Sequence, residues 1–219
     1  MDFSKFVSLL DTGCLFFSRS DLLGDTFEGS YSHADKKLRE IMEKNWGIDY
    51  SNLINIRKRS RKLTFINCWH ASGIESDAMW RVYTKSYSSI AILSTYDRLY
   101  KCLPPDVTIS LVKYINYKSG QLPEVDLISP YFYKHQSFHH ERELRAIIQD
   151  IPPIDDLSCV EPESVAGKYI PVNLNYLILR IYVAPSSPSW FLELVTNICR
   201  KYEITKRIVQ SNLNNDPFF

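Results

Sequence analysis

The chain has 219 residues, enough for one sizeable hydrophobic core or at most two small ones. Hydrophobic residues make up 45% of it and charged residues 23%, which excludes an intrinsically disordered chain. The formal net charge is +1, so no global field attracts nucleic acid or membranes, and any anion-binding site must be local. We therefore predict one folded domain over residues 1–219.

Sequence features at the start of the chain and at its cysteines predict a cytoplasmic protein without a membrane partner. Asp2, Lys5 and Asp11 interrupt the apolar core that a signal peptide needs. No apolar stretch approaches the length of a membrane span. The five cysteines are odd in number and form no C-x-x-C pair, which is typical of reduced thiols.

Helical and extended patterns follow each other irregularly along the chain. The predicted helices are one that opens at Phe3 and ends at Gly13, then 33–46, 77–87, 97–102 and one that begins at Ser187 and Pro188. The predicted strands are 14–18, 64–68, 89–94, 108–117, 143–149, 169–172, 177–183 and 206–210. Residues 21–29 form a polar turn, and residues 118–137 and 152–167 form loops. Because strands and helices do not alternate strictly, we predict an α+β fold with a mixed, mostly antiparallel sheet flanked by helices.

The segment 138–148 carries the densest group of charges on a predicted strand. Alternate residues of a strand share a face, so an apolar face lies opposite Glu141, Glu143 and Arg145. Such charges are costly to bury unless they are paired or solvated, so we expect this face to line a cleft or the solvent. Two neighbouring carboxylates can divide acid–base work, because repulsion raises the pKa of one. The alternative is a surface ion pair between Arg145 and either glutamate.

A second segment, residues 67–70, ends a strand with possible metal ligands. Cys68 and His70 share a strand face and could bind zinc together with His139 or His140. The spacing matches no standard zinc template, so we assign no metal ligand. We expect Cys68 to be a small core residue and His70 a hydrogen-bonded loop residue.

Several aromatic and hydroxyl side chains are candidates for holding a ligand. Trp80 and Tyr83, with Trp69, either form a stacking wall for a base or belong to the core. Ser94 and Thr95 either position a ligand or satisfy the backbone groups at the end of a strand.

Local basic groups offer anion contacts. Arg19 either grips a phosphate or pairs with Asp25 or Glu28. The basic run 57–62 either contacts a nucleic-acid backbone or forms a solvated loop or helix face. The chain contains no P-loop, G-x-G-x-x-G or G-x-S-x-G motif and only seven glycines, which excludes kinases, P-loop enzymes and α/β-hydrolases.

At these residues the chain resembles a widespread bacterial family known as a domain of unknown function. Over nearly the whole chain, the matching motifs are LFFSR at 15–19, GDTFEG at 24–29, NCWH at 67–70 followed by ES at 75–76 and AMW at 78–80, STY at 94–96, SF at 137–138, HERELRA at 140–146, AP at 184–185 and SWF at 189–191. The chain departs from the family at Thr26, where Pro is usual, and at His139, where Glu is usual. The family also commonly has an aromatic-Arg-aromatic element upstream of the position of Met1.

More distantly, the chain is similar to ADP-ribosyltransferases of the Arg-Ser-Glu type. Arg19, then Ser94-Thr95, then Glu141 and Glu143 follow in the order of their three motifs. The resemblance implies NAD as cofactor, held by Arg19 and Ser94. It also implies Glu143 as the catalytic residue that stabilises an oxocarbenium-like ribose, assisted by Glu141.

Three hypotheses about function follow from the sequence. The first is a nucleotide-using transferase with a protein or nucleic-acid acceptor, acting as a toxin or antiphage effector. The second is a non-catalytic binding or regulatory domain that uses aromatic and basic surfaces. The third is a metal-dependent enzyme. The first requires Arg19, Ser94 and Glu143 to converge on one cleft, whereas the second predicts that they are dispersed or paired with other groups.

Overall fold

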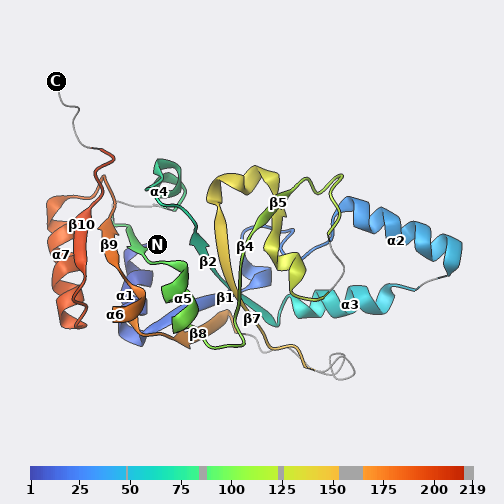
Figure 1. The fold of residues 1–219 in the computed structure, drawn as a ribbon, viewed down its shortest axis with the longest axis horizontal. Helices are drawn as coiled ribbons and strands as arrows, with labels where there is room; N and C mark the ends of the chain where they lie inside the picture. Colours follow the sequence, from blue (N-terminus) through green and yellow to red (C-terminus); the bar gives the residue numbers. More distant parts are fainter. Residues whose placement is uncertain (48, 84–87, 123–125, 153–164, 215–219) are drawn as a thin grey trace. The chain divides into compact units, whose positions relative to one another are not determined.

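The computed structural model describes all residues except 48, 84–87, 123–125, 153–164 and 215–219, and Figure 1 shows its elements. It is an α+β fold in which most strand pairs are antiparallel, which confirms the predicted fold class. The chain divides into two compact units, described separately below. The first comprises residues 1–16, 73–104 and 169–219, and the second comprises residues 17–72 and 105–168. The single domain stays a prediction.

The first unit contains a three-stranded sheet and five helices. In the sheet, β9 (Arg180–Val183) pairs antiparallel with β3 (Ile90–Leu93) and parallel with β10 (Arg207–Gln210). The helices are α1 (Phe3–Thr12), α4 (Asp77–Tyr83), α5 (Tyr96–Cys102), α6 (Leu174–Leu177) and α7 (Ser189–Lys201). The amphipathic faces of α1 and α7 supply much of the core, and the rings of Phe3 and Phe191 meet edge to face at 5.3 Å.

The ends of these helices confirm some sequence signals and correct others. Gly13 ends α1 with a left-handed backbone (φ 64°), as predicted. The N-cap of α5 is Thr95, whose hydroxyl accepts a hydrogen bond from the Arg98 amide, so this helix begins at Tyr96, one residue before the predicted start. Helix α7 begins after Pro188, because proline suits the entry to a helix without a side-chain cap.

The strands of the second unit belong to a five-stranded sheet with the order β4-β7-β2-β1-β8, of which β4, β7 and β2 lie wholly within this unit. These strands are β1 (Cys14–Arg19), β2 (Thr64–His70), β4 (Thr108–Leu111), β7 (Glu143–Gln149) and β8 (Gly167–Pro171). Along the antiparallel pair of β2 and β7, Ile66 lies opposite Ile147, and Cys68 opposite Arg145. One face of the pair is therefore the apolar face of Ala146 and Ile148, which are buried, as predicted.

The opposite face of this pair is covered by chain that the sequence assigned to a loop. Within residues 118–137 lie the 3-10 helix η2 (Ser129–Phe132) and the strand β6 (Tyr133–His135). The buried Tyr131 packs on Ile66 and Ile147. The predicted strand 108–117 divides into β4 and β5 (Lys113–Ile115), because β5 leaves the sheet to pair in parallel with β6.

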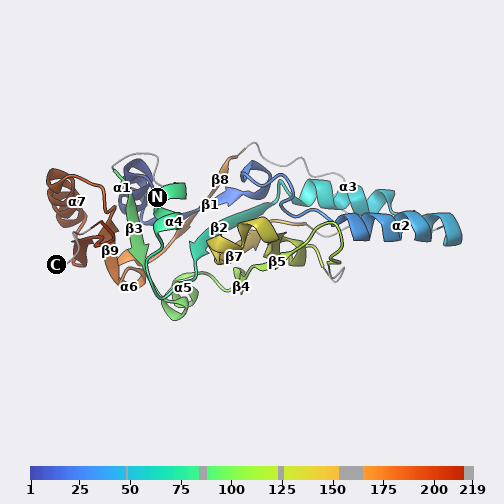
Figure 2. The same ribbon diagram turned by 90° about the horizontal axis from the view of Figure 1, so that it is seen from above.

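Two helices of the second unit, α2 (His33–Trp46) and α3 (Ser51–Ser60), lie side by side and extend away from its sheet in both views (Figures 1 and 2). A capping box between Ser32 and Asp35 fixes the start of α2, which confirms the predicted helix 33–46. The first half of the basic run 57–62 belongs to α3, a helix that the sequence did not predict.

Two chain-wide expectations concern membranes and thiols. None of the helices in the described residues combines the length and the apolar character that a membrane crossing requires. Four cysteines fall within the described residues, and all four are free thiols. Cys159 and most of the predicted acidic loop 152–167 lie outside the described residues.

We expect Gly29→Ala to destabilise the protein more than Gly47→Ala. Both glycines have a φ of 66°, where a Cβ atom costs about 1–2 kcal/mol. A Cβ on Gly29 would also lie 2.6 Å from Cζ of the buried Tyr131 ring, whereas a Cβ on Gly47 meets nothing within 4 Å. The check is urea unfolding of both variants, and equal losses would contradict the close packing at Gly29.

Candidate functional site

The second unit contains a group of five buried charged side chains, called here the charge cluster: Glu28, Lys134, Glu141, Glu143 and Arg145. Glu143 and Arg145 project from the same face of β7, and Lys134 lies on β6. Glu141 ends the 3-10 helix η3 (Gln136–Glu141), and Glu28 lies in the turn between η1 (Ser20–Leu22) and α2. The prediction that the charged face lines a cleft or the solvent was wrong, because pairing rather than hydration compensates these charges.

Arg145 is the centre of the charge cluster and is only 1% exposed. Its Nε donates to Oε2 of Glu143 at 2.6 Å, and its Nη2 donates to Oε2 of Glu28 at 2.9 Å. Its Nη1 donates both to Oε1 of Glu28 and to the Tyr131 carbonyl oxygen. The guanidinium therefore holds Glu28 through two parallel hydrogen bonds, the arrangement for which its planar fork is suited.

Lys134 joins the two glutamates that the sequence proposed as catalytic. Its Nζ lies 2.5 Å from Oε2 of Glu141 and 2.5 Å from Oε1 of Glu143. The same ammonium group lies 4.5 Å from the centre of the Phe138 ring. Both carboxylate oxygens of Glu143 thus accept hydrogen bonds from cations within the protein.

The local backbone explains how two glutamates reach one lysine. Arg142 has a left-handed conformation (φ 41°), so the strand starts at Glu143 and does not include Glu141. The prediction that both glutamates alternate along one strand was therefore wrong at Glu141. The turn is held by the Ala71 amide, which donates to the Arg142 carbonyl at 2.8 Å. Nδ1 of His70 lies 2.6 Å from the Glu141 carbonyl oxygen.

The charge cluster holds three carboxyl groups and two cations, so it is balanced when one carboxyl group keeps its proton. Burial raises the pKa of Glu141, and a hydrogen bond with Glu143 raises this pKa further. Burial also acts to raise the pKa of Glu143, but the hydrogen bond with Glu141 and the Arg145 and Lys134 groups hold that pKa well below its usual range. Burial also raises the pKa of Glu28, so Glu141 and Glu28 are both shifted toward the protonated form and Glu143 toward the ionised form.

Three members of the charge cluster were missed as site residues by sequence reasoning: Glu28, Lys134 and Arg145, the last of which was considered only as the partner in an ion pair. Glu28 was expected beside Arg19, but it pairs with Arg145, which is 117 positions away in the chain. Lys134 fell in a predicted loop. The available signal was the resemblance, because Glu28 lies in its GDTFEG motif and Arg145 in its HERELRA motif.

Arg19 lies in the second unit, at the end of β1. Its Nε donates to Oδ1 of Asp21 at 2.7 Å, and its Nη1 donates to the Val165 carbonyl oxygen at 3.0 Å. The partner expected from the sequence was Asp25 or Glu28, and the ion pair with Asp21 corrects that prediction. The pair closes the turn after the strand.

The other predicted ligand-holding residues belong to the first unit. The Ser94 hydroxyl donates to the Leu177 carbonyl oxygen at 2.7 Å, and Thr95 caps α5. Nε1 of Trp80 donates to Glu75 at 3.1 Å, and Tyr83 is exposed. Helix α4 has no buried residue, so the interpretation of Trp80 and Tyr83 as core residues was wrong.

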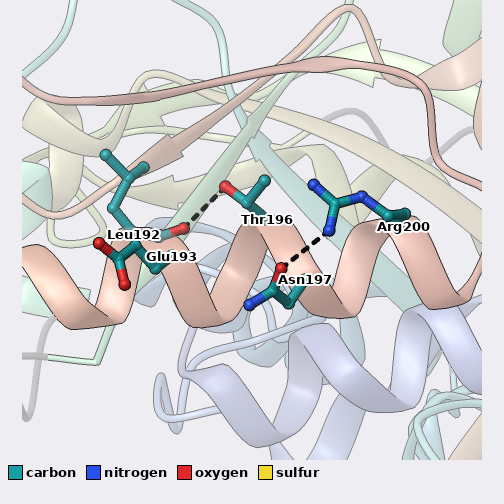
Figure 3. A pocket seen from close by; sticks show the side chains of 5 residues that line it. All are labelled: Leu192, Glu193, Thr196, Asn197 and Arg200. Atoms are coloured by element: carbon teal, nitrogen blue, oxygen red, sulfur yellow. Dashed lines mark hydrogen bonds between the residues drawn. The ribbon is translucent and has the colours of Figure 1, made fainter.

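Two hollows are lined by residues of the first unit, whereas the charge cluster belongs to the second unit. One, of about 330 Å³, is lined by Asp77, Trp80, Arg81, Ala184, Pro185, Ser186 and Asn214. Another, of about 400 Å³, lies along α7 (Figure 3). There Thr196 donates to the Leu192 carbonyl oxygen and Arg200 to Asn197, so these polar side chains have partners within the helix.

The proposed metal ligands do not gather. In the part of the chain that the structure describes, no group of three or more His, Cys, Asp or Glu side chains is placed to hold a metal ion. Cys68 is exposed, so its interpretation as a core residue was wrong. Its place opposite Arg145 puts it beside the charged face rather than the apolar face of the sheet.

Comparison with protein-family models, with curated proteins and with solved structures finds no match for this chain. The resemblance to a bacterial family, and the NAD chemistry that the more distant likeness implies, therefore stay predictions.

We expect Arg145→Leu to reduce the free energy of unfolding by about 3–5 kcal/mol, because it leaves buried carboxylates of Glu28 and Glu143 without their partner. The matched control is Arg81→Leu, which removes an ion pair with Asp77 whose side chains are 80% and 54% exposed. Chemical unfolding measures both variants. A loss for Arg145→Leu no larger than that for the control would contradict the buried network.

We expect Glu141→Gln and Glu143→Gln to change the pH dependence of stability in opposite directions. The raised pKa of Glu141 stabilises the fold below the unfolded value of about 4.3, and this contribution is lost as pH rises through the folded pKa. The lowered pKa of Glu143 stabilises the fold above the unfolded value, and this contribution is lost as pH falls through the folded pKa. Urea unfolding between about pH 4 and 8 should show Glu141→Gln gaining on the unmodified protein as pH rises. Urea unfolding between about pH 2 and 5 should show Glu143→Gln falling behind the unmodified protein as pH rises. Curves parallel to that of the unmodified protein in these windows would refute the opposite pKa shifts.

Proposed function

We propose that this chain is a non-catalytic binding domain. The observation that carries the proposal is the state of Glu143, the candidate catalytic residue. Its side chain is 5% exposed, and both of its carboxylate oxygens accept hydrogen bonds from Lys134 and Arg145. A catalytic carboxylate must touch the group on which positive charge develops, and these two internal cations occupy that place.

The energetics support the same conclusion. To stabilise a ribosyl cation, Glu143 would have to give up Lys134 or Arg145, and breaking a buried pair costs about 3–5 kcal/mol. Arg19 and Ser94 are also engaged, the first with Asp21 and Val165 and the second with the Leu177 carbonyl oxygen. If the chain is a binding domain, the sequence analysis predicts that Arg19, Ser94 and Glu143 are dispersed or paired with other groups of the protein.

Exposed side chains offer surfaces through which a binding domain can act. Trp80 and Tyr83 lie on α4, which buries none of its residues, and Tyr83 is exposed. The helices α2 and α3 carry exposed basic and apolar side chains. Many exposed apolar side chains on a surface are typical of surfaces that bind a partner.

The transferase remains a second candidate because one observation favours it. The pKa of Glu141 is raised and that of Glu143 is lowered, and a pair of carboxyl groups driven apart in this way is the usual arrangement for acid–base catalysis. In that function NAD would be the cofactor, and a protein or a nucleic acid would accept the transferred group. A role as a toxin or antiphage effector belongs to this candidate.

We expect no NAD consumption when the protein is mixed with NAD and a bacterial lysate that supplies acceptors. Mass spectrometry of free nicotinamide is the measurement, with Glu143→Gln and the exposed Glu193→Gln as matched variants and an active ADP-ribosyltransferase as positive control. Nicotinamide release by the unmodified protein and by Glu193→Gln, but not by folded Glu143→Gln, would overturn the binding domain and establish the transferase.

A further inference from the structure

We propose that α2 and α3, called here the basic helix pair, bind single-stranded nucleic acid. The inference rests on the proposed function, since it names the partner of a domain that acts by binding. Lysines of the pair would contact phosphates, and exposed apolar side chains would contact the faces of unpaired bases.

Charge supplies the first argument. Residues 33–62 contain nine lysines and arginines against four acidic residues, whereas the whole chain has a net charge of only +1. Helix α3 contains no acidic residue. The lysines Lys37 and Lys44 on α2, and Lys58 and Lys62 on or directly after α3, are exposed. This local excess of positive charge is what a polyanion requires, and its effect falls steeply with salt.

Exposed apolar residues supply the second argument. Trp46 is 67% exposed, and Leu38, Ile41 and Ile54 are 46%, 44% and 40% exposed. Residues four apart on a helix are neighbours, so Lys37 lies beside Ile41 on α2. In the same way Lys58 lies beside Ile54 on α3. Each helix therefore carries an exposed lysine next to an exposed apolar side chain.

Arginine, tyrosine and methionine side chains make the contacts on the inner side of the pair. Arg39 and Arg57 are buried, with their guanidinium carbons 3.1 and 4.1 Å from the centre of the Tyr31 ring. The Tyr50 hydroxyl, just before α3, donates to the sulfur of Met42 on α2 at 3.3 Å. These contacts fix the two helices as a preformed platform.

The combination of contacts selects a single strand over a duplex. A duplex presents phosphates and base edges but hides the faces of its bases by stacking, so it would use the lysines and offer the apolar side chains no base face. A single strand presents both phosphates and base faces, and proteins bind it with cationic grooves and aromatic side chains. Trp46 is the side chain suited to stacking on a base.

Fluorescence anisotropy tests the inference, with fluorescein-labelled oligo(dT) and oligo(rU) of about 20 nucleotides and a duplex of equal length as competitor. We expect binding whose affinity falls linearly with salt on logarithmic axes. The triple variant Lys37→Glu, Lys58→Glu and Lys62→Glu should bind at least tenfold more weakly, and Trp46→Ala about fivefold or more. Lys201→Glu, on the exposed face of α7, is the control and should bind like the unmodified protein.

Three outcomes would overturn the inference. The first is no binding of either oligonucleotide at about 50 mM salt. The second is a duplex that binds as tightly as the single strand, with no effect of Trp46→Ala, because that would indicate phosphate contacts alone. The third is binding only to vesicles that contain phosphatidylglycerol, which would make the partner an anionic lipid surface. Unfolding curves of each variant confirm that the fold is intact.

The two experiments separate this inference from the proposed function. If the protein neither releases nicotinamide nor binds oligonucleotides, single-stranded nucleic acid is refuted as the partner but the proposal of a binding domain is not. If it releases nicotinamide in a Glu143-dependent way, the proposed function itself is refuted.

Discussion

A guanidinium group that is buried must stay charged, because arginine does not lose its proton inside a protein. Arg145 imposes this constraint on the second unit. Its charge is compensated only when Glu28 approaches from the turn before α2 and Glu143 from its own strand. Glu143 is then shared with Lys134, which in turn brings Glu141 into the network. Each further side chain pairs with a charged group that the previous pairs leave without a full set of partners. The five side chains therefore depend on one another.

The same network ties together segments that are distant in sequence. The turn at Glu28, the covering segment at Tyr131 and Lys134, and the strand β7 all converge on Arg145. Buried ion pairs add little net stability compared with apolar residues of the same size, but they penalise every arrangement in which a partner is missing. The charge cluster therefore acts chiefly to select one way of folding the turn and the covering segment onto the sheet.

Local patterns in the sequence predicted the elements that local physics determines. The helix 33–46 was predicted with its observed bounds from its local pattern, and the structure adds a capping box that fixes its start. The two faces of β7 were predicted from the alternation of apolar and charged residues. Pairing between segments was not predictable in this way. Glu28 finds its partner more than a hundred residues away, and the three-residue strand β6 is too short to show a period.

In the candidate site, too, local sequence patterns did not predict which distant segments come together. Glu141 and Glu143 were correctly placed together, since they are neighbours in the chain. What surrounds them was missed, because Lys134 gives no signal of its own within a polar segment. The left-handed backbone at Arg142 was not predictable either, because the sequence has no glycine at that position. The position of Lys134 and the turn at Arg142 place the carboxylates of Glu141 and Glu143 against cations of the protein itself. Both features depend on tertiary packing.

The order in which the chain contributes to its two units has a consequence for biosynthesis. The second unit draws on residues 17–72 and 105–168, so all of its segments have left the ribosome before synthesis reaches the end of the first unit's sheet. The sheet of the first unit needs β3 near residue 90, but its partners β9 and β10 follow about residues 180 and 207. The early segments of the first unit therefore remain without their sheet partners while the second unit folds, and unpaired strand edges of this kind are prone to aggregation.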